Sequence, residues 1–286
     1  MPDDPASLTP TRQVSVIRFA GGAVTRAADV AAAEEPLDVR LHGKSFAVIM
    51  RTPGHDKALA AGFLLSERII RSADDIGAIE HCRHPDQARA HHVVDVYLVG
   101  DAASRVSETL GRRREVIANS SCGVCGRATI DELLSEVAPL TSAGVVPVSV
   151  IRALPDALRA RQSTFDETGG LHAAAICSAS GEILAVAEDV GRHNAVDKVV
   201  GSLLLGAFDA AGAVRERSTR ILMVSGRVSF EIVQKAWIAG IEVVAAISAP
   251  TSLAVDLAQA ANVTLIGFLR PASLNIYSAA GRIATV

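Results

Sequence analysis

In the stretch ILMVSGRVSFEIVQKAWIAGIEVVAAI (residues 221–247), two short apolar runs flank a segment of helical length. The runs Ile221–Val224 and Val243–Ile247 have the length and residue types of buried strands, and Phe230–Gly240 between them predicts a helix. The alternation continues on both sides, with predicted strands at 173–177, 183–188 and 263–268 and predicted helices at 194–208 and 252–261. Repeated β-α-β units predict an α/β fold with a mainly parallel sheet that carries helices on both faces.

The first half of the chain has a different pattern, in which strands dominate. Polar and apolar residues alternate over Gln13–Phe19 and again from Leu37 to Met50, where His42-Gly43-Lys44 marks the turn of a hairpin. A helix is predicted from Asp56 to Glu67, and a further strand from Val93 to Val99.

Composition divides the chain into three segments. Residues 1–12 are rich in Pro, Asp, Ser and Thr, which is typical of a disordered tail. Proline and glycine make the region around 139–150 loop-like, so we place a domain boundary there. We therefore expect a smaller, β-rich α+β part at 13–145 and an α/β domain at 146–286.

Charge and hydropathy exclude several classes of protein. The 286 residues are 49% apolar, which allows a large buried core, and the net charge of −3 gives no global positive field for nucleic acid or an anionic membrane. The acidic, proline-broken start does not match a secretory signal. No window approaches the roughly 18 uncharged apolar residues that a membrane span requires. We expect a cytoplasmic protein that binds neither nucleic acid nor membranes.

The pair Cys122-Gly-Val-Cys125 is the sharpest chemical signal in the sequence. It precedes a predicted helix and lies near Arg112-Arg113-Arg114 and Arg127, and both features favour the reactive thiolate. Three chemistries use such a pair: dithiol–disulfide exchange, half of a zinc site, and persulfide transfer. Zinc would need two more ligands, and the spacing of Cys82 and its neighbouring histidines matches no familiar finger. We predict no metal site.

Two turns are predicted at strand-to-helix junctions and could bind anions. The first holds Gly191, Arg192 and His193, and the second Ser225, Gly226 and Arg227. A helix N-terminus offers free N–H groups to an anion, and arginine can bind phosphate in a bidentate manner. The simpler interpretation is a pair of helix starts with solvated charges. We expect both turns to line one crevice. His172, which follows a glycine pair, is a further candidate binding residue, although a lone histidine is more often a structural donor.

Known nucleotide and hydrolase signatures are absent. The sequence contains no G-x-x-x-x-G-K-[ST], no G-x-G-x-x-G and no G-x-S-x-G.

Taken together, these segments resemble the FdhD family of formate dehydrogenase accessory sulfurtransferases. The resemblance runs from about Glu34 to the end and rests on short motifs in a fixed order: Glu35-Pro36-Leu37, Met50-Arg51-Thr52-Pro53-Gly54, Gly62-Phe63-Leu64-Leu65-Ser66-Glu67, Cys122-Gly-Val-Cys125-Gly126, Thr168-Gly169-Gly170-Leu171-His172, Glu188-Asp189-Val190-Gly191-Arg192-His193-Asn194-Ala195, Ser225-Gly226-Arg227 and Gly267-Phe268-Leu269-Arg270.

The resemblance implies a sulfurtransferase that works through a cysteine persulfide. Cys122 would accept sulfur from a cysteine desulfurase, with Cys125 assisting. The sulfur would pass to the bis-molybdopterin guanine dinucleotide cofactor, carrying molybdenum or tungsten, before the formate dehydrogenase catalytic subunit receives it. Guanine nucleotides would mimic half of this cofactor. The family's cofactor-binding stretch matches Phe268, Leu269, Arg270, Pro271, Ala272 and Ser273 here.

The resemblance also implies a homodimer and a fold similar to that of cytidine deaminases. The zinc signature of those enzymes is absent, because Ala173 and Ala174 follow His172 where His-x-Glu would be expected. Two rival functions stay open. One is an α/β hydrolase or deaminase that uses His172 and Asp189 in acid–base roles, and the other is a non-catalytic chaperone for the cofactor.

Overall fold

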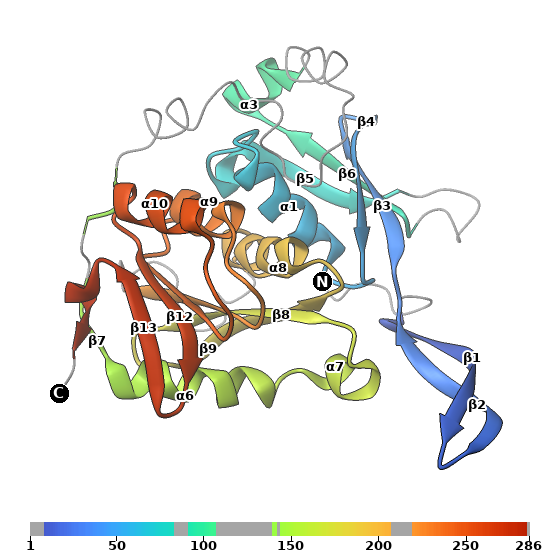
Figure 1. Cartoon of the computed structure of the whole chain (residues 1–286). Coiled ribbons are helices and arrows are strands. Elements are labelled where there is room, and N and C mark those ends of the chain that lie inside the picture. The colour runs from blue at the N-terminus through green and yellow to red at the C-terminus, as the bar shows by residue number, and fades with distance from the viewer. Residues whose placement is uncertain (1–8, 83–90, 107–138, 142–143, 207–218, 285–286) are drawn as a thin grey trace.

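The computed structural model describes residues 9–82, 91–106, 139–141, 144–206 and 219–284. Their centre is a six-stranded sheet with the order β13-β12-β11-β10-β8-β9 (Figure 1). Its strands are β8 (His172–Ser178), β9 (Ile183–Asp189), β10 (Arg220–Val224), β11 (Val243–Ala246), β12 (Thr264–Arg270) and β13 (Ser273–Ser278). Each strand predicted in this half is present within a few residues of its expected bounds, whereas β13 was not predicted.

The prediction of a mainly parallel sheet is wrong. Within this sheet, two pairs are parallel: β10 with β11, and β11 with β12. The other three pairs are antiparallel: β8 with β9, β8 with β10, and β12 with β13. The length of the connections explains two of the three antiparallel pairs. β8–β9 and β12–β13 are joined by turns too short for a crossover, and short turns join antiparallel strands.

Helices cover both faces of this sheet, as predicted (Figure 1). Alternate residues of each strand face opposite sides: Leu222 and Val224 pack with α8 (Arg192–Leu204), α9 (Phe230–Ile238) and α10 (Ser252–Ala260), while Ile221 and Met223 pack with α6 (Val148–Arg159). The loop-like interpretation of 139–150 was incomplete, because β7 (Val146–Pro147) and the start of α6 lie within it. Pro147 takes the cap position of α6, where proline does not interrupt a helix.

Three short elements complete this half of the chain. β7 pairs in parallel with β14 (Ile283–Ala284), which follows the 3-10 turn η4 (Ala280–Arg282). α7 (Ser163–Thr168) precedes β8.

A second sheet of four strands, β4-β3-β6-β5, lies in the N-terminal half. The predicted hairpin is present as β3 (Glu35–Leu41) and β4 (Lys44–Arg51), and the predicted helix as α1 (Asp56–Ser66). The other elements are η1 (Ala73–Asp75), β5 (Ile76–His81), β6 (Val93–Leu98) and α3 (Gly100–Ser104).

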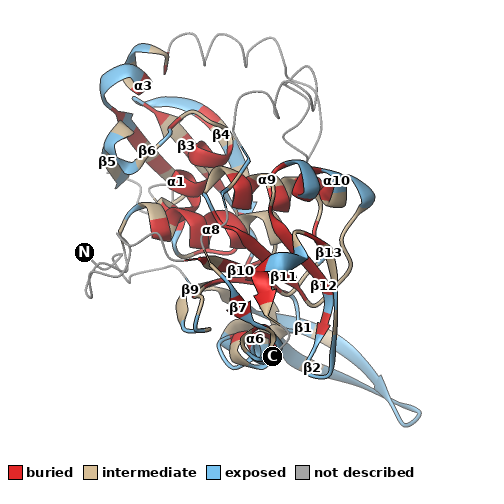
Figure 2. Cartoon of the chain, turned by 90° about the vertical axis from the view of Figure 1, so that its left-hand side faces the viewer, coloured by how far each residue is buried: buried red, intermediate tan, exposed pale blue. Residues whose placement is uncertain are grey.

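An isolated hairpin of β1 (Thr11–Ala20) and β2 (Ala23–Ala32) extends away from both sheets (Figures 1 and 2). Gly21 and Gly22 form its turn, with φ values of 56° and 80° that favour glycine. Thr11 and Arg12 belong to β1, so the disordered tail predicted at 1–12 extended two residues too far. Residues 1–8 lie outside the described part.

Helix α1 packs directly against α8, and this contact joins the two sheets. One hydrophobic cluster runs from Leu37 and Leu59 in the first half to Val199 and Trp237 in the second. Figure 2 shows this buried zone continuing through α1, α8 and the large sheet. Among the described helices, none is long and apolar enough to cross a membrane. The division into two domains stays a prediction.

Candidate anion-binding edge

The predicted polar turns meet along one edge of the large sheet. β9 to β12 end at this edge and β8, which runs against β10, begins there. Val228 after β10 forms an isolated parallel bridge with Pro250 after β11, and the backbone N–H of Phe268 donates to Ser248 O at 3.1 Å. The segments that follow β10, β11 and β12 therefore lie side by side.

His172, Arg192 and Gly226 converge at this edge. A Cβ added to Gly226 would lie 3.2 Å from His172 Nδ1 and 3.8 Å from Arg192 Cβ. Ser225 fixes this approach, because its hydroxyl accepts from the Ala173 N–H and its own N–H donates to Ala173 O, both at 2.9 Å. A side chain at position 226 would crowd the space between the imidazole and the arginine.

The electrostatics of this cluster suit an anion. Burial, and then the nearby positive charge of Arg192, lower the pKa of His172 below its usual value. Arg192 Nε is buried and has no hydrogen-bond partner among the described residues. The adjacent N-terminus of α8 has Gly191 as its cap and no capping side chain. A bound anion would supply a partner for these donors.

Asp189 holds this turn in place. The carboxylate is fully buried and accepts four hydrogen bonds: from Gly191 N at 2.8 Å, Asn194 Nδ2 at 2.9 Å, Thr52 N at 3.1 Å and Lys198 Nζ at 2.8 Å. A carboxylate offers about four lone pairs, and all are occupied. These bonds give Asp189 a structural part in the turn, and the acid–base role that the rival hydrolase hypothesis assigned to it stays a prediction.

The sequence did not predict that the N-terminal half would support this turn. Lys198 donates to Thr52 O at 2.8 Å, and Asn194 donates to Met50 O at 2.7 Å. Buried Arg51 forms a bidentate pair with Asp56, with bonds of 2.9 and 3.0 Å. In the sequence, Met50–Gly54 stands out only through the family resemblance. The one local sign of a role for this segment is Arg51, a charged residue at the end of an otherwise apolar strand.

The predicted cofactor-binding stretch forms the end of β12 and the turn into β13. Phe268 is 46% exposed with a φ of 51°, an uncommon conformation for a bulky residue. Leu269 is fully buried in the core. Arg270 donates to Ile247 O and Leu269 O, so its guanidinium braces the backbone. Phe268, Arg270 and the turn residues Pro271, Ala272 and Ser273 are all exposed, so these members of the stretch can meet a ligand through their side chains.

The remaining predicted residues fall into two groups. Arg227 is exposed at the same edge, and His193 Nε2 contacts Glu231 Oε2 at 2.9 Å and Ser229 Oγ at 3.0 Å. Cys122 and Cys125, with the arginines around them, lie outside the described residues. Of the described thiols, Cys177 is buried, and burial raises its pKa to about 12. In the described ranges, no three His, Cys, Asp or Glu side chains are grouped to hold a metal ion.

Comparison with protein families gives a match over residues 32–284 to the model of the FdhD/NarQ family. The chain belongs to the FdhD/NarQ family. The match covers both sheets and the anion-binding edge, so the resemblance inferred from the motifs is confirmed.

Curated relatives of this FdhD/NarQ chain carry the name sulfur carrier protein FdhD. One from Streptomyces avermitilis is 48% identical over 280 residues, and one from Streptomyces coelicolor is 47% identical over 279; each alignment covers 96% of both chains. One from Anaeromyxobacter dehalogenans is 46% identical and covers 90% of this chain and 88% of its own.

A solved structure, that of a formate dehydrogenase accessory protein from Desulfotalea psychrophila, has the same fold as this FdhD/NarQ chain. The TM-score is 0.72 at 23% identity, with 96% of this chain and all of the other covered. The implied likeness to cytidine deaminases stays a prediction.

Proposed function

We propose that this chain is a sulfur carrier for the maturation of formate dehydrogenase. The observation that carries the proposal is its similarity, over nearly the whole length, to proteins named sulfur carrier protein FdhD. The Cys122-Gly-Val-Cys125 pair supplies the chemistry, since a thiolate can take up sulfur as a persulfide. The donor would be a cysteine desulfurase, and the acceptor the bis-molybdopterin guanine dinucleotide cofactor, bound as cargo.

Two thiols allow both sulfur transfers to balance. In loading, the Cys122 thiolate attacks the terminal sulfur of the desulfurase persulfide, so that a Cys122 persulfide forms and the desulfurase thiolate leaves. In delivery, the Cys125 thiolate attacks the inner sulfur. A Cys122–Cys125 disulfide then forms, and the outer sulfur leaves as sulfide with the electron pair of the broken bond. The disulfide would afterwards be reduced by a cellular dithiol.

The anion-binding edge supports the cargo part of the proposal. The cofactor carries two pyrophosphates, and a chain with a net charge of −3 needs a local basic site to hold them. His172, Arg192 and the uncapped N-terminus of α8 provide one. Exposed Phe268 and the turn after it lie at the same edge and can contact a ring of the cargo.

The proposal includes a homodimer that serves the formate dehydrogenase catalytic subunit in the cytoplasm. The β1–β2 hairpin supports a protein interface, because a lone two-stranded ribbon is marginally stable in water. Ile17, Phe19 and Val24 on this hairpin are 59%, 77% and 61% exposed.

The alternative is a chaperone that binds the cargo without transferring sulfur, and the same edge would serve it. The experiment that separates the two functions uses the intact mass of the protein after incubation with a cysteine desulfurase and cysteine. The proposal expects a gain of one sulfur that is lost in Cys122→Ala, together with loss of formate dehydrogenase maturation. Cys177→Ala is the matched control and should behave as the parent. Maturation that survives Cys122→Ala would leave the chaperone function.

A further inference from the structure

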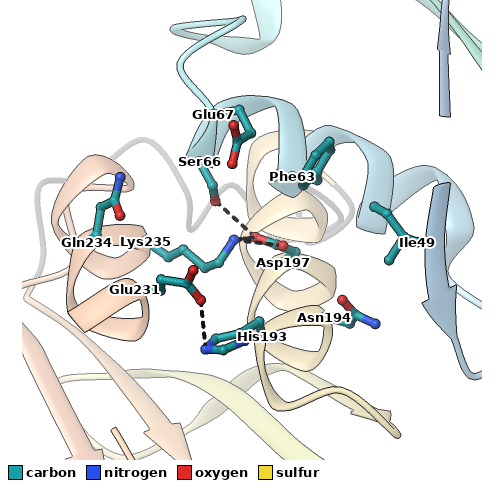
Figure 3. A pocket seen from close by; sticks show the side chains of 10 residues that line it. All are labelled: Ile49, Phe63, Ser66, Glu67, His193, Asn194, Asp197, Glu231, Gln234 and Lys235. Carbon is teal, nitrogen blue, oxygen red and sulfur yellow. Dashed lines mark hydrogen bonds and ion pairs between the residues drawn. The ribbon is translucent and has the colours of Figure 1, made fainter. Parts of the chain in front are cut away.

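Four cationic side chains are buried in the described part of the chain, and three of them contact a buried carboxylate. Figure 3 shows one of these contacts, in which Lys235 on α9 reaches the carboxylate of Asp197 on α8. Such pairing is the rule, because a charge taken out of water without a partner costs free energy. The three pairs have nitrogen–oxygen distances of 2.8 or 2.9 Å and are Arg51–Asp56, Lys198–Asp189 and Lys235–Asp197. The fourth cation, Arg282, pairs with no carboxylate of the described residues.

Arg282 lies at the end of the large sheet that is opposite to the anion-binding edge. It is the last residue of η4, directly before β14, and is 3% exposed. Its guanidinium reaches back to the first residue of β12, where Nη1 donates to Thr264 Oγ1 at 3.3 Å. The Thr264 hydroxyl donates in turn to Ala279 O at 2.8 Å. Since β12 begins here and ends at the anion-binding edge, the two places are separated by the length of the strand.

Two donors of this guanidinium are left over. Nε and Nη2 of Arg282 are buried, and neither has a hydrogen-bond partner within the described ranges. Their N–H groups lie on one edge of the planar guanidinium and point the same way, which is an arrangement that can hold an anion between them. Burial lowers the pKa of Arg282, and the charge of Glu242 offsets only part of that effect. An arginine nevertheless stays charged at neutral pH, so this edge attracts negative charge.

A hydroxyl without a partner is brought to the same corner of the sheet. Thr219 directly precedes β10 and is 3% exposed, and its Oγ1 has no hydrogen-bond partner among the described residues. An added Cβ at Gly144 would lie 3.0 Å from Thr219 Oγ1, so the segment that leads into β7 packs on this hydroxyl. β7 pairs in parallel with β14, with Val146 opposite Ile283. The pairing of these two short strands therefore holds Arg282, the neighbour of Ile283, near Thr219.

The buried carboxylate of Glu242 does not complete this set of donors. Its Oε2 accepts from the N–H of Arg220 at 3.0 Å, and within the described ranges it forms no ion pair with Arg282. Alternation along the strands places Glu242 on the face of the sheet covered by α9, and Thr264 on the face covered by α6. The Arg282 edge thus needs a counterion of its own.

We propose that the Nε–Nη2 edge of Arg282, together with the Thr219 hydroxyl, binds a chloride ion at this end of the sheet. The donor atoms are closed off from solvent, which favours a small monatomic anion over a phosphate, a nucleotide or a carboxylate ligand. Bound chloride gives Arg282 the counterion that the other three buried cations have. It also links η4 and β14 to the start of β10. This chloride site is separate from the anion-binding edge and takes no part in sulfur transfer.

The dependence of stability on chloride tests the proposal in the full chain. Urea unfolding is measured over a range of chloride concentrations, with sodium gluconate holding the ionic strength constant because its anion is too large for an enclosed site. Above the dissociation constant, the unfolding equilibrium constant should fall tenfold for each tenfold rise in chloride, as one ion that binds the folded chain alone requires. Arg282→Met should abolish this dependence, and Thr219→Val, which keeps the side-chain shape but removes the hydroxyl, should shift it to higher chloride. Arg152→Met, a matched loss of charge at an exposed position of α6, should behave as the parent.

The comparison between variants isolates this site. Any chloride that binds at the anion-binding edge contributes equally to the parent and to Arg282→Met, so their difference reports the Arg282 site alone. A parent with the same chloride dependence as Arg282→Met would overturn the proposal, and an unchanged dependence in Thr219→Val would remove the hydroxyl from the site.

Bromide, which replaces chloride and scatters X-rays anomalously, gives a second measurement that needs no variant to fold. Crystals of the parent grown in bromide should show an anomalous peak in contact with Nε and Nη2 of Arg282. A water molecule or a protein carboxylate at that position would overturn the assignment.

Discussion

The close crossing of α1 and α8 makes Gly201→Ala the most informative single substitution in the fold. A Cβ at position 201 would lie 1.8 Å from Ala58 O, and one at Gly62 would lie 2.0 Å from Asp197 O. Both obstacles are backbone atoms, which cannot rotate away as a flexible side chain could. The two helices would have to separate by roughly 1.6 Å at Gly201 for this Cβ to reach an ordinary contact distance.

The expected cost follows from two opposing effects. Overpacking of this kind typically destabilises a protein by about 1–3 kcal/mol. We take the upper part of that range, because the backbone of α1 or α8 would have to shift to make room. Alanine is a better helix former than glycine by about 1 kcal/mol, which offsets part of the loss. We therefore expect Gly201→Ala to lower the free energy of unfolding by about 2 kcal/mol. In a chain of 286 residues, with an unfolding entropy of about 2.1 cal/mol/K per residue, that corresponds to a fall of roughly 3 °C in Tm.

Urea unfolding and thermal melts followed by circular dichroism measure the change. Gly281→Ala is the matched control, because an added Cβ at that position meets nothing within 4 Å. Its stability should stay the same or rise slightly. A Gly201→Ala protein that melts at or above the temperature of the parent would refute the geometry of the crossing.

Three further predictions concern the anion-binding edge, the thiols and the hairpin. Because the pKa of His172 is lowered by burial and by Arg192, the ring is neutral near pH 7. A bound anion favours the imidazolium, so sulfate affinity should rise as the pH falls below the usual histidine pKa of about 6.5. His172→Asn should flatten that slope, and an unchanged slope would remove the histidine from the site. Cys177, with a pKa of about 12, should resist iodoacetamide at pH 8 in the folded chain and react on unfolding, as read by intact mass. Phe19→Ser combined with Val24→Ser should weaken the proposed homodimer in sedimentation without lowering the free energy of unfolding by more than about 1 kcal/mol, since both residues are exposed. A dimer that survives would place the interface elsewhere.

The elements that the sequence predicted well are those whose packing is visible in a local pattern. The helices and strands from β8 to β12 alternate in short apolar and amphipathic segments, and the structure contains each of them. Pairing direction was not predictable in this way. Whether β8 lies beside β10 in an antiparallel manner depends on which strands become neighbours, and no local pattern records that choice.

The candidate site was predictable in part for a similar reason. Glycine turns with arginine or histidine at strand ends marked His172, Arg192 and Gly226, and sheet geometry brings such ends together. No pairing was predicted for Asp197 or Lys235, because a charge within a helix usually faces solvent. Their pairing joins residues 38 positions apart and becomes apparent only when α8 and α9 pack together.

The anion-binding edge is assembled across the predicted domain boundary, and this has a testable consequence. Asp189, Asn194 and Lys198 of the second half each bond to the backbone of Met50 or Thr52 in the first half. Without the first half, the α8 face that packs on α1 would be exposed, and the buried Lys198 ammonium would lose the carbonyl of Thr52. The exposed apolar face and the unpaired buried groups would each cost several kcal/mol. The total stability of a typical protein is about 5–15 kcal/mol, so these losses would remove most of it. We therefore expect residues 146–286 expressed alone to lack a cooperative unfolding transition, and to regain it when residues 9–145 are co-expressed. A fragment 146–286 that unfolds cooperatively and binds pyrophosphate with the affinity of the full chain would show that the edge belongs to an independent domain.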